Sequence, residues 1–316
     1  MASTSQNLRK RTPASNTDEA TQPMINKPQQ AAAHQQPLLL SIDFQPEWYK
    51  DNEYIHTGYR PVTNSYLGSL RSFLYIHNET GNIYSHLLAA LWMLLLPLIY
   101  YPYAKEHYST ANSDDWLVFG LFFLGGFLCY TCSVAYHVFS NHSHAVHDVC
   151  LRVDLFGITT VTAGCFPPGM WYTFPCMDRK TRIWWISIET LAQILAAIAI
   201  FLVPAFRARS MKPLRGFVFS FMASAAFYPI IAACFLHGYR IMDREAGATR
   251  YALTVLTYLL AVTIYATKLP EASRPGAFDI WGHSHQIFHV LMAVGLTIHF
   301  AAFAKAFDYI HTRKQC

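Results

Sequence analysis

Seven apolar runs, each long enough to cross a lipid bilayer, constrain the fold of this chain more than any other feature of its sequence. The hydrocarbon core of a bilayer is about 30 Å thick, and an α-helix needs about 20 residues to cross it. The expected spans are Ile83–Tyr103, Trp116–His137, Val149–Pro168, Ile183–Pro204, Leu214–His237, Arg250–Lys268 and His285–Phe307. Because the connections between them are short, the sequence predicts an all-α integral membrane protein with one bundle of seven transmembrane helices.

The composition also indicates a membrane protein. Of the 316 residues, 53% are hydrophobic and only 14% are charged, whereas about a quarter of the residues in a typical soluble domain are charged. The formal net charge is +5 and no long basic run is present, so we expect no nucleic-acid partner. The third span carries Arg152 and Asp154. If it were a loop, six helices would remain.

The segments outside the spans divide the chain further. Residues 1–36 are rich in Gln, Ala, Ser, Thr and Pro, and we expect a disordered tail there. Residues 37–82 form a juxtamembrane segment, in which the spacing of Leu67, Leu70 and Leu74 predicts a short amphipathic helix at the membrane surface. Residues 83–307 are the predicted transmembrane domain, and residues 308–316 are a short C-terminal tail.

The charges that flank the spans do not decide the orientation in the membrane, because Lys and Arg are divided almost evenly between the two faces. Two glycosylation sequons, Asn78–Thr80 and Asn141–Ser143, fall on the face shared with the N-terminus. Glycosylation at either one would report which side of the membrane that face occupies.

Histidines gather where the last span begins, in the stretch Trp281–Val290. His285 and His289 are four residues apart, so on a helix they lie above one another on one face. His283 points to a different side of a regular helix, and we expect it not to join that pair.

Seven spans also bring four helix ends to one membrane face: the start of the first, the end of the second, and the starts of the third and seventh. Polar residues are concentrated at those ends. They are Asn82, Ser85, His86, Ser133, His137, Asp154, His285 and His289. Ionisable groups at membrane depth are costly unless they are paired or bound to a metal, so the cluster predicts a functional site.

Within this cluster, the shared depth of His137, His285 and His289 predicts a zinc site. Three protein ligands leave a fourth position for water, which is the pattern of catalytic zinc. Asp154 is placed to hold that water without binding zinc directly. Ser133, one helical turn before His137, could orient either group.

The remaining histidines have simpler interpretations. We expect His86 and His299 to be hydrogen-bonded packing residues inside the bundle. His142, His144 and His147 resemble a metal-binding group in spacing, but they lie in a predicted short loop, where we expect them to be solvated.

Taken together, the motifs resemble those of the progestin and adipoQ receptor family, which includes the adiponectin receptors, the fungal zinc-homeostasis proteins and, more distantly, haemolysin III. The resemblance runs from about Asp51 to the last helix, through DNEYIHTGYRP, HNETGNIYSH, SVAYH, RVDLFGI and FDIWGHSHQIFHV. It implies a cytosolic N-terminus, opposite to that of G-protein-coupled receptors, in the plasma membrane or the endoplasmic reticulum.

The resemblance also implies a zinc ion near the cytosolic face, held by His137, His285 and His289. The family's characteristic serine and aspartate correspond to Ser133 and Asp154, the latter contacting zinc through water.

Two functional hypotheses follow. The first is a zinc-binding receptor that regulates lipid metabolism, with a ceramide, a sphingolipid or a fatty acid as its lipid and an extracellular protein as a further ligand. The second is a zinc-dependent hydrolase of lipid amides, with ceramide as the leading substrate and Asp154 as general base. In a receptor without hydrolysis, zinc would only tie helices together, yet a structural zinc more often has four protein ligands.

Overall fold

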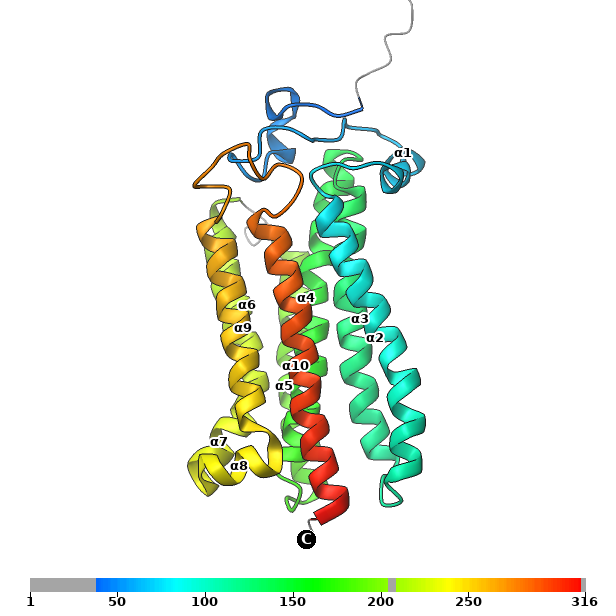
Figure 1. Ribbon diagram of the computed structural model, residues 1–316, viewed down its shortest axis with the longest axis vertical. Coiled ribbons are helices and arrows are strands. Elements are labelled where there is room, and N and C mark those ends of the chain that lie inside the picture. Colours follow the sequence, from blue (N-terminus) through cyan, green and yellow to red (C-terminus); the bar gives the residue numbers. More distant parts are fainter. Residues whose placement is uncertain (1–37, 204–208, 314–316) are drawn as a thin grey trace, which may run out of the picture. The chain divides into compact units, whose positions relative to one another are not determined.

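The computed structural model describes residues 38–203 and 209–313. Among these residues, seven helices are long and apolar enough to cross a membrane (Figure 1), so the predicted all-α, seven-helix architecture is confirmed. The predicted tail 1–36 lies outside the described residues. The first, second, third and seventh spans extend beyond both predicted ends, and the last one continues as helix through Arg313. The fourth and sixth spans end at Leu202 and Thr267, just short of the predicted Pro204 and Lys268.

Six of the seven spans are single helices. They are α2 (Thr80–His107), α3 (Ser113–Phe139), α4 (His144–Thr173), α5 (Arg179–Leu202), α9 (Ala248–Thr267) and α10 (Ser284–Arg313). The remaining span is built from α6 (Lys212–Ser224), a 3₁₀ turn at Ala225–Phe227 and α7 (Tyr228–His237). The break precedes Pro229, whose missing N–H is tolerated in the first turn of a helix.

The third span is one continuous helix, α4, that carries both Arg152 and Asp154. The six-helix alternative is therefore wrong. Ser143 caps the start of this helix by accepting a hydrogen bond from the Val146 N–H. His144 and His147 thus belong to the first turn of α4, so the expected loop is wrong for these two residues. His144 is exposed as expected, whereas His147 is only partly exposed. His147 packs against the ring of Trp48.

Close contact between α3 and α4 depends on small residues. A Cβ atom at Gly125 would lie 2.5 Å from the Thr160 carbonyl oxygen, and one at Gly164 would lie 2.6 Å from that of Leu121. Small residues of this kind allow helix backbones to approach closely in membranes. The approach sets α3, which carries His137, directly beside α4, which carries Asp154.

The core beneath these contacts is aromatic. Phe122 and Phe303 are fully buried with their ring centroids 4.7 Å apart, and Phe119 packs edge-to-face against Phe307 at 5.2 Å. Offset and edge-on ring contacts add to the energy of burial alone, so they join the first half of α3 to the second half of α10.

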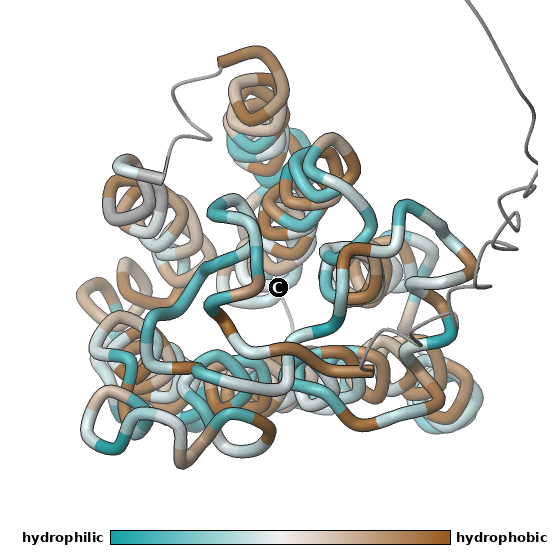
Figure 2. The backbone as a smooth tube through the Cα atoms, turned by 90° about the horizontal axis from the view of Figure 1, so that it is seen from above, coloured by the Kyte–Doolittle hydropathy of each residue, from teal (hydrophilic) through white to brown (hydrophobic). Residues whose placement is uncertain are grey.

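At one end of the bundle, the juxtamembrane segment and the loop before α10 are tied together. Asp279 accepts hydrogen bonds from the backbone N–H groups of His56 and Thr57, at 2.9 and 2.8 Å. Glu271 accepts from Asn52 at 3.0 Å and from the Ser284 N–H at 2.7 Å. In the view from above, these connecting segments cross over the helix ends (Figure 2).

The short surface helix predicted from the leucine spacing coincides with α1 (Tyr66–Leu70) and the 3₁₀ turn Arg71–Leu74. Leu67, Leu70 and Leu74 are all exposed, as expected for side chains that face a membrane surface. Another short helix, α8 (Tyr239–Ala246), lies at the opposite end of the bundle and was not predicted.

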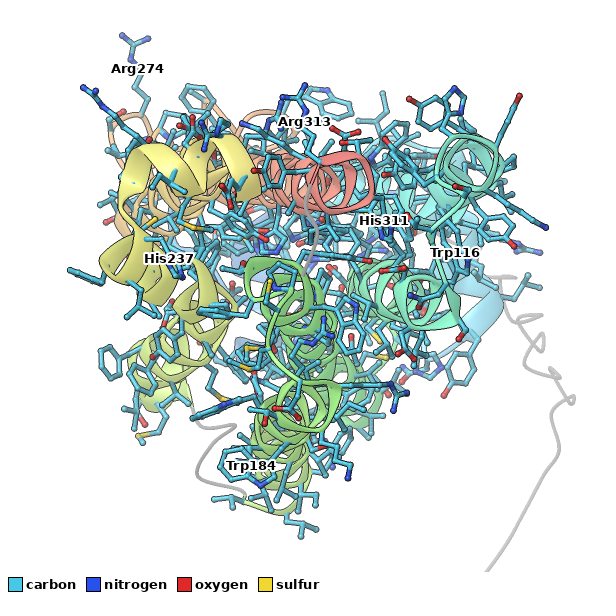
Figure 3. The ribbon with its side chains drawn as sticks, turned by 90° about the horizontal axis from the view of Figure 1, so that it is seen from below. Trp116, Trp184, His237, Arg274, His311 and Arg313 are labelled. Atoms are coloured by element: carbon cyan, nitrogen blue, oxygen red, sulfur yellow. The ribbon has the colours of Figure 1, made fainter. Side chains whose placement is uncertain are left out.

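At that opposite end, a polar contact also joins α3 and α10. The His311 Nε2 atom lies 3.3 Å from the Asp115 carboxylate, in the region where Figure 3 shows His311 and Trp116. The same view places Trp184 of α5 at the periphery. Deeper in the membrane, α5 is joined to α4 by a hydrogen bond of 2.7 Å between Thr162 and Gln193.

Candidate metal centre

Three predicted ligands meet at the end of the bundle where α10 begins. His137 lies near the end of α3, whereas His285 and His289 occupy the first two turns of α10. One ring nitrogen from each lies within 4.8 Å of the others, so these three residues, here called the histidine triad, could hold a metal ion.

In two of the three histidines, His137 and His289, the nitrogen that faces away from the centre is held by a hydrogen bond. The His137 Nδ1–H donates to Glu79 Oε2 at 2.7 Å, and His289 Nδ1 lies 3.2 Å from the Asn82 carbonyl oxygen. These bonds select the tautomer in which Nε2 carries the free lone pair. The His137 Nε2 atom is buried and has no hydrogen-bond partner among the described residues, so the residues present fit a metal ion.

Glu79, which the sequence analysis did not identify, organises both sides of the triad. Besides accepting from His137, its carboxylate accepts from the Asn82 side chain at 2.7 Å, and the backbone carbonyl of Asn82 in turn supports His289. Burial raises the pKa of Glu79, but the interaction with His137, the hydrogen bond from Asn82 and the charge of Arg60 together hold the pKa well below its usual value. Its place directly before the first span is the sequence signal that could have identified it.

Arg60, also missed, holds the end of α3. This fully buried side chain donates to the backbone carbonyls of His137 and Val138, at 2.6 and 3.0 Å, and to the Ser72 and Ser140 hydroxyls, at 2.8 and 3.1 Å. The last carbonyls of a helix have no partners within the helix, and a cation is favourable there. Arg60 therefore fixes the backbone that carries His137.

His77 supports Glu79 from behind. Its Nδ1 accepts a hydrogen bond of 3.1 Å from the Glu79 N–H, which requires a neutral ring. Burial, and next the charge of Arg60, lower the pKa of His77 to about 3, so the ring remains an acceptor at physiological pH.

Asp154 and Ser133 flank the triad without joining it. Asp154 lies close to His137 and to the Ser133 side chain. The Ser133 hydroxyl is buried. Both side chains therefore stand beside the centre without supplying a ligand to it.

The other histidines lie outside the triad. His283 precedes α10, and its Nε2 lies 3.2 Å from the Asn78 carbonyl oxygen. Gly282, with φ of +81°, forms the bend before the helix. His86 and His299 are buried as expected. Their ring nitrogens form no well-aligned hydrogen bond within the part of the chain that the structure describes, although backbone groups of His289 and Cys165 lie close to them.

A cavity of about 480 Å³ lies elsewhere, between α2 and α3. Its walls come from the C-terminal half of α2 and the N-terminal half of α3, and include Pro97, Tyr101, Trp116 and Phe123. It does not adjoin the histidine triad.

A family model described as "Haemolysin-III related" matches residues 74–300. The chain belongs to this family. The matched residues contain Glu79 and all three members of the triad.

Individual haemolysin-III related proteins show the same relationship. The adiponectin receptor protein of Drosophila melanogaster is 31% identical over 271 residues, which cover 86% of this chain and 60% of that relative. The ADIPOR-like receptor IZH2 of Saccharomyces cerevisiae is 27% identical over 277 residues, covering 88% and 86%. Human progestin and adipoQ receptor family member 3 is 31% identical over 255 residues, covering 79% and 80%.

These relatives confirm the resemblance to the progestin and adipoQ receptors, and with the seven spans they identify an integral membrane protein. The chain spans less than two thirds of the length of the Drosophila relative.

Proposed function

We propose that the histidine triad binds zinc and that the protein is a receptor of lipid metabolism whose centre also cleaves lipid amides. One observation carries the proposal: the His137 Nε2 atom is buried and unpaired among the described residues, while its Nδ1 is held by Glu79. Imidazole nitrogens suit zinc, and three protein ligands leave one coordination position open, as in catalytic sites.

The residues around the triad suit hydrolysis. Zinc, when bound, would polarise a carbonyl group and activate water for attack. Asp154 would accept the proton of that water, because its carboxylate lies near His137 without belonging to the ligand set. The Ser133 hydroxyl, which is buried next to the Asp154 carboxylate, would orient Asp154 or the substrate.

The location of the centre points to a lipid substrate. The triad lies on membrane-spanning helices, so an amide that reaches it from the bilayer would be attached to acyl chains. Ceramide is the leading candidate, with other sphingolipids or a fatty acid as related ligands. The relatives' names add a receptor role, for which an extracellular protein is the further partner that we propose.

The alternative is a dedicated zinc-dependent ceramide hydrolase without a receptor role. A third model is a receptor without hydrolysis, in which zinc would serve only as a structural link that ties α3 to α10. The nearby pair of Asp154 and Ser133 favours hydrolysis over a structural link alone, because a structural link has no use for a proton acceptor.

Zinc content and ceramide hydrolysis of the purified protein test the proposal. Replacing His137, His285 or His289 by Ala should abolish stoichiometric zinc and lower the melting temperature, because metal binding stabilises the folded state. The matched control, His283→Ala, should keep zinc, since His283 lies outside the triad. Equal loss of zinc from the control would contradict the proposed ligand set.

The Asp154→Asn variant distinguishes a hydrolytic zinc centre from a purely structural one. Zinc and melting temperature should be retained, because the three histidines remain, while ceramide hydrolysis should fall by about 10²–10⁴-fold, as expected for losing a general base. Unchanged hydrolysis would exclude Asp154 as the base. If the unmodified protein binds zinc but hydrolyses none of a panel of ceramides, the hydrolase role is excluded and only the receptor role remains.

A further inference from the structure

His86, on α2, is a buried imidazole beside the histidine triad to which nothing above assigns a role. It is 6% exposed, and its ring stacks on that of His289 with 3.5 Å between the centroids and 10° between the planes. The ring of Tyr130 also packs against His86, with 4.9 Å between the ring centroids. Neither Nδ1 nor Nε2 has a hydrogen-bond partner among the described residues.

The other buried imidazoles at this end of the bundle are all bonded. His77 accepts from the Glu79 N–H, His137 donates to Glu79, and His283 and His289 lie within hydrogen-bond range of backbone carbonyls. Buried polar groups are nearly always satisfied, and an exception calls for a partner that is not protein. His86 is the exception here.

The stacked geometry argues against His86 as a fourth metal ligand. The lone pair of an imidazole nitrogen lies in the plane of its own ring, and the rings of His86 and His289 lie in nearly parallel planes with their centroids 3.5 Å apart, so the lone pairs of the two rings do not converge on one point. His86 is also not among the residues whose nitrogens converge within 4.8 Å. Its nitrogens suit a polar atom bound next to the metal better than the metal itself.

We infer that His86 binds the lipid, donating a hydrogen bond to the amide carbonyl oxygen; this inference rests on the proposed function. A neutral imidazole has one N–H donor and one acceptor nitrogen, which complements a secondary amide with its C=O acceptor and N–H donor. A donor aimed at an oxygen that gains negative charge during attack also stabilises the transition state. His86 thereby becomes a catalytic residue that distinguishes lipid amides from lipids without an amide.

The test compares His86→Phe, which keeps an aromatic ring without donors, with His86→Gln, which keeps a side-chain N–H. His299→Phe is the matched control, because His299 is likewise buried and unpaired among the described residues but lies ten positions further along α10 than His289. Zinc content, melting temperature, ceramide hydrolysis and lipid binding are measured for all. Binding uses ceramide and a matched lipid with a methylene in place of the amide carbonyl.

His86→Phe should retain zinc and fold, lower kcat/KM for ceramide by about 10²–10³-fold, and weaken binding of ceramide but not of the carbonyl-free lipid. His86→Gln should recover part of the loss, and His299→Phe should resemble the parent. Unchanged ceramide binding and hydrolysis in His86→Phe, or loss of its zinc, would overturn the assignment. A parent that holds no zinc or binds no ceramide would instead overturn the proposed function itself.

Discussion

At the scale of single residues, the centre is built from inner histidines and outer partners that fix their orientation. Glu79 is an outer partner that acts on two members of the triad, because it holds His137 directly and His289 through Asn82. Such outer partners fix the tautomer and the ring plane of a ligating imidazole and raise its basicity. The free energy of metal binding should therefore depend on a residue that never touches the metal.

Glu79→Gln should weaken zinc binding by about 10–100-fold, because the amide keeps a hydrogen-bond acceptor for His137 but loses the negative charge. Competition with a fluorescent zinc chelator measures the affinity. Glu53→Gln is the control, since Glu53 is exposed and pairs only loosely with Lys268, at 3.4 Å. An affinity equal to that of the control would show that the carboxylate does not tune the centre.

At the scale of helices, the position of the triad depends on how two helix ends are held. The end of α3 is bound by Arg60 through two backbone carbonyls. The start of α10 is bound by Glu271, which accepts hydrogen bonds from both the N–H and the hydroxyl of Ser284. A carboxylate is favourable at a helix N-terminus and a guanidinium at a C-terminus, so each end has the charge that its dipole prefers.

Arg60→Met should lower the free energy of unfolding by about 2–5 kcal/mol, because it leaves the carbonyls of His137 and Val138 buried without donors. The measurement is the melting temperature in detergent, with and without added zinc. Arg71→Met serves as the matched control, as Arg71 is exposed and should tolerate the change. Equal melting temperatures of the two variants would refute the structural role of Arg60.

At the scale of the whole molecule, seven spans place the two ends of the transmembrane domain on opposite sides of the membrane. Asn78 and Asn141, the two natural sequon residues, are 5% and 0% exposed. Burial of this degree hinders glycosylation on either side, so their unmodified state would not by itself reveal the orientation.

We expect the N-terminus to be cytosolic, as the family resemblance implies. A spacer with a sequon appended after Cys316 should be glycosylated in a eukaryotic host, whereas the same extension placed before Met1 should not. Sensitivity of the size shift to a glycosidase confirms the modification. The opposite pattern would place the N-terminus, and with it the histidine triad, on the outer side.

The sequence by itself determined the seven spans and the grouping of His137, His285 and His289. Both depend on properties that are local or periodic: apolar length decides what crosses a bilayer, helical spacing pairs His285 with His289, and the alternation of spans assigns each helix end to a face. The continuous α4 follows the same rule, since its apolar length outweighs Arg152 and Asp154.

Only the tertiary structure decided which groups surround the triad. Glu79 meets His137 across 58 residues and Arg60 reaches the His137 carbonyl across 77, and no periodicity in the sequence encodes such pairs. The same holds for the stacking of His86 on His289, which depends on how closely α2 approaches α10. Apolar length and helical period act along one segment, whereas a hydrogen bond or a ring contact between helices exists only once their packing is set.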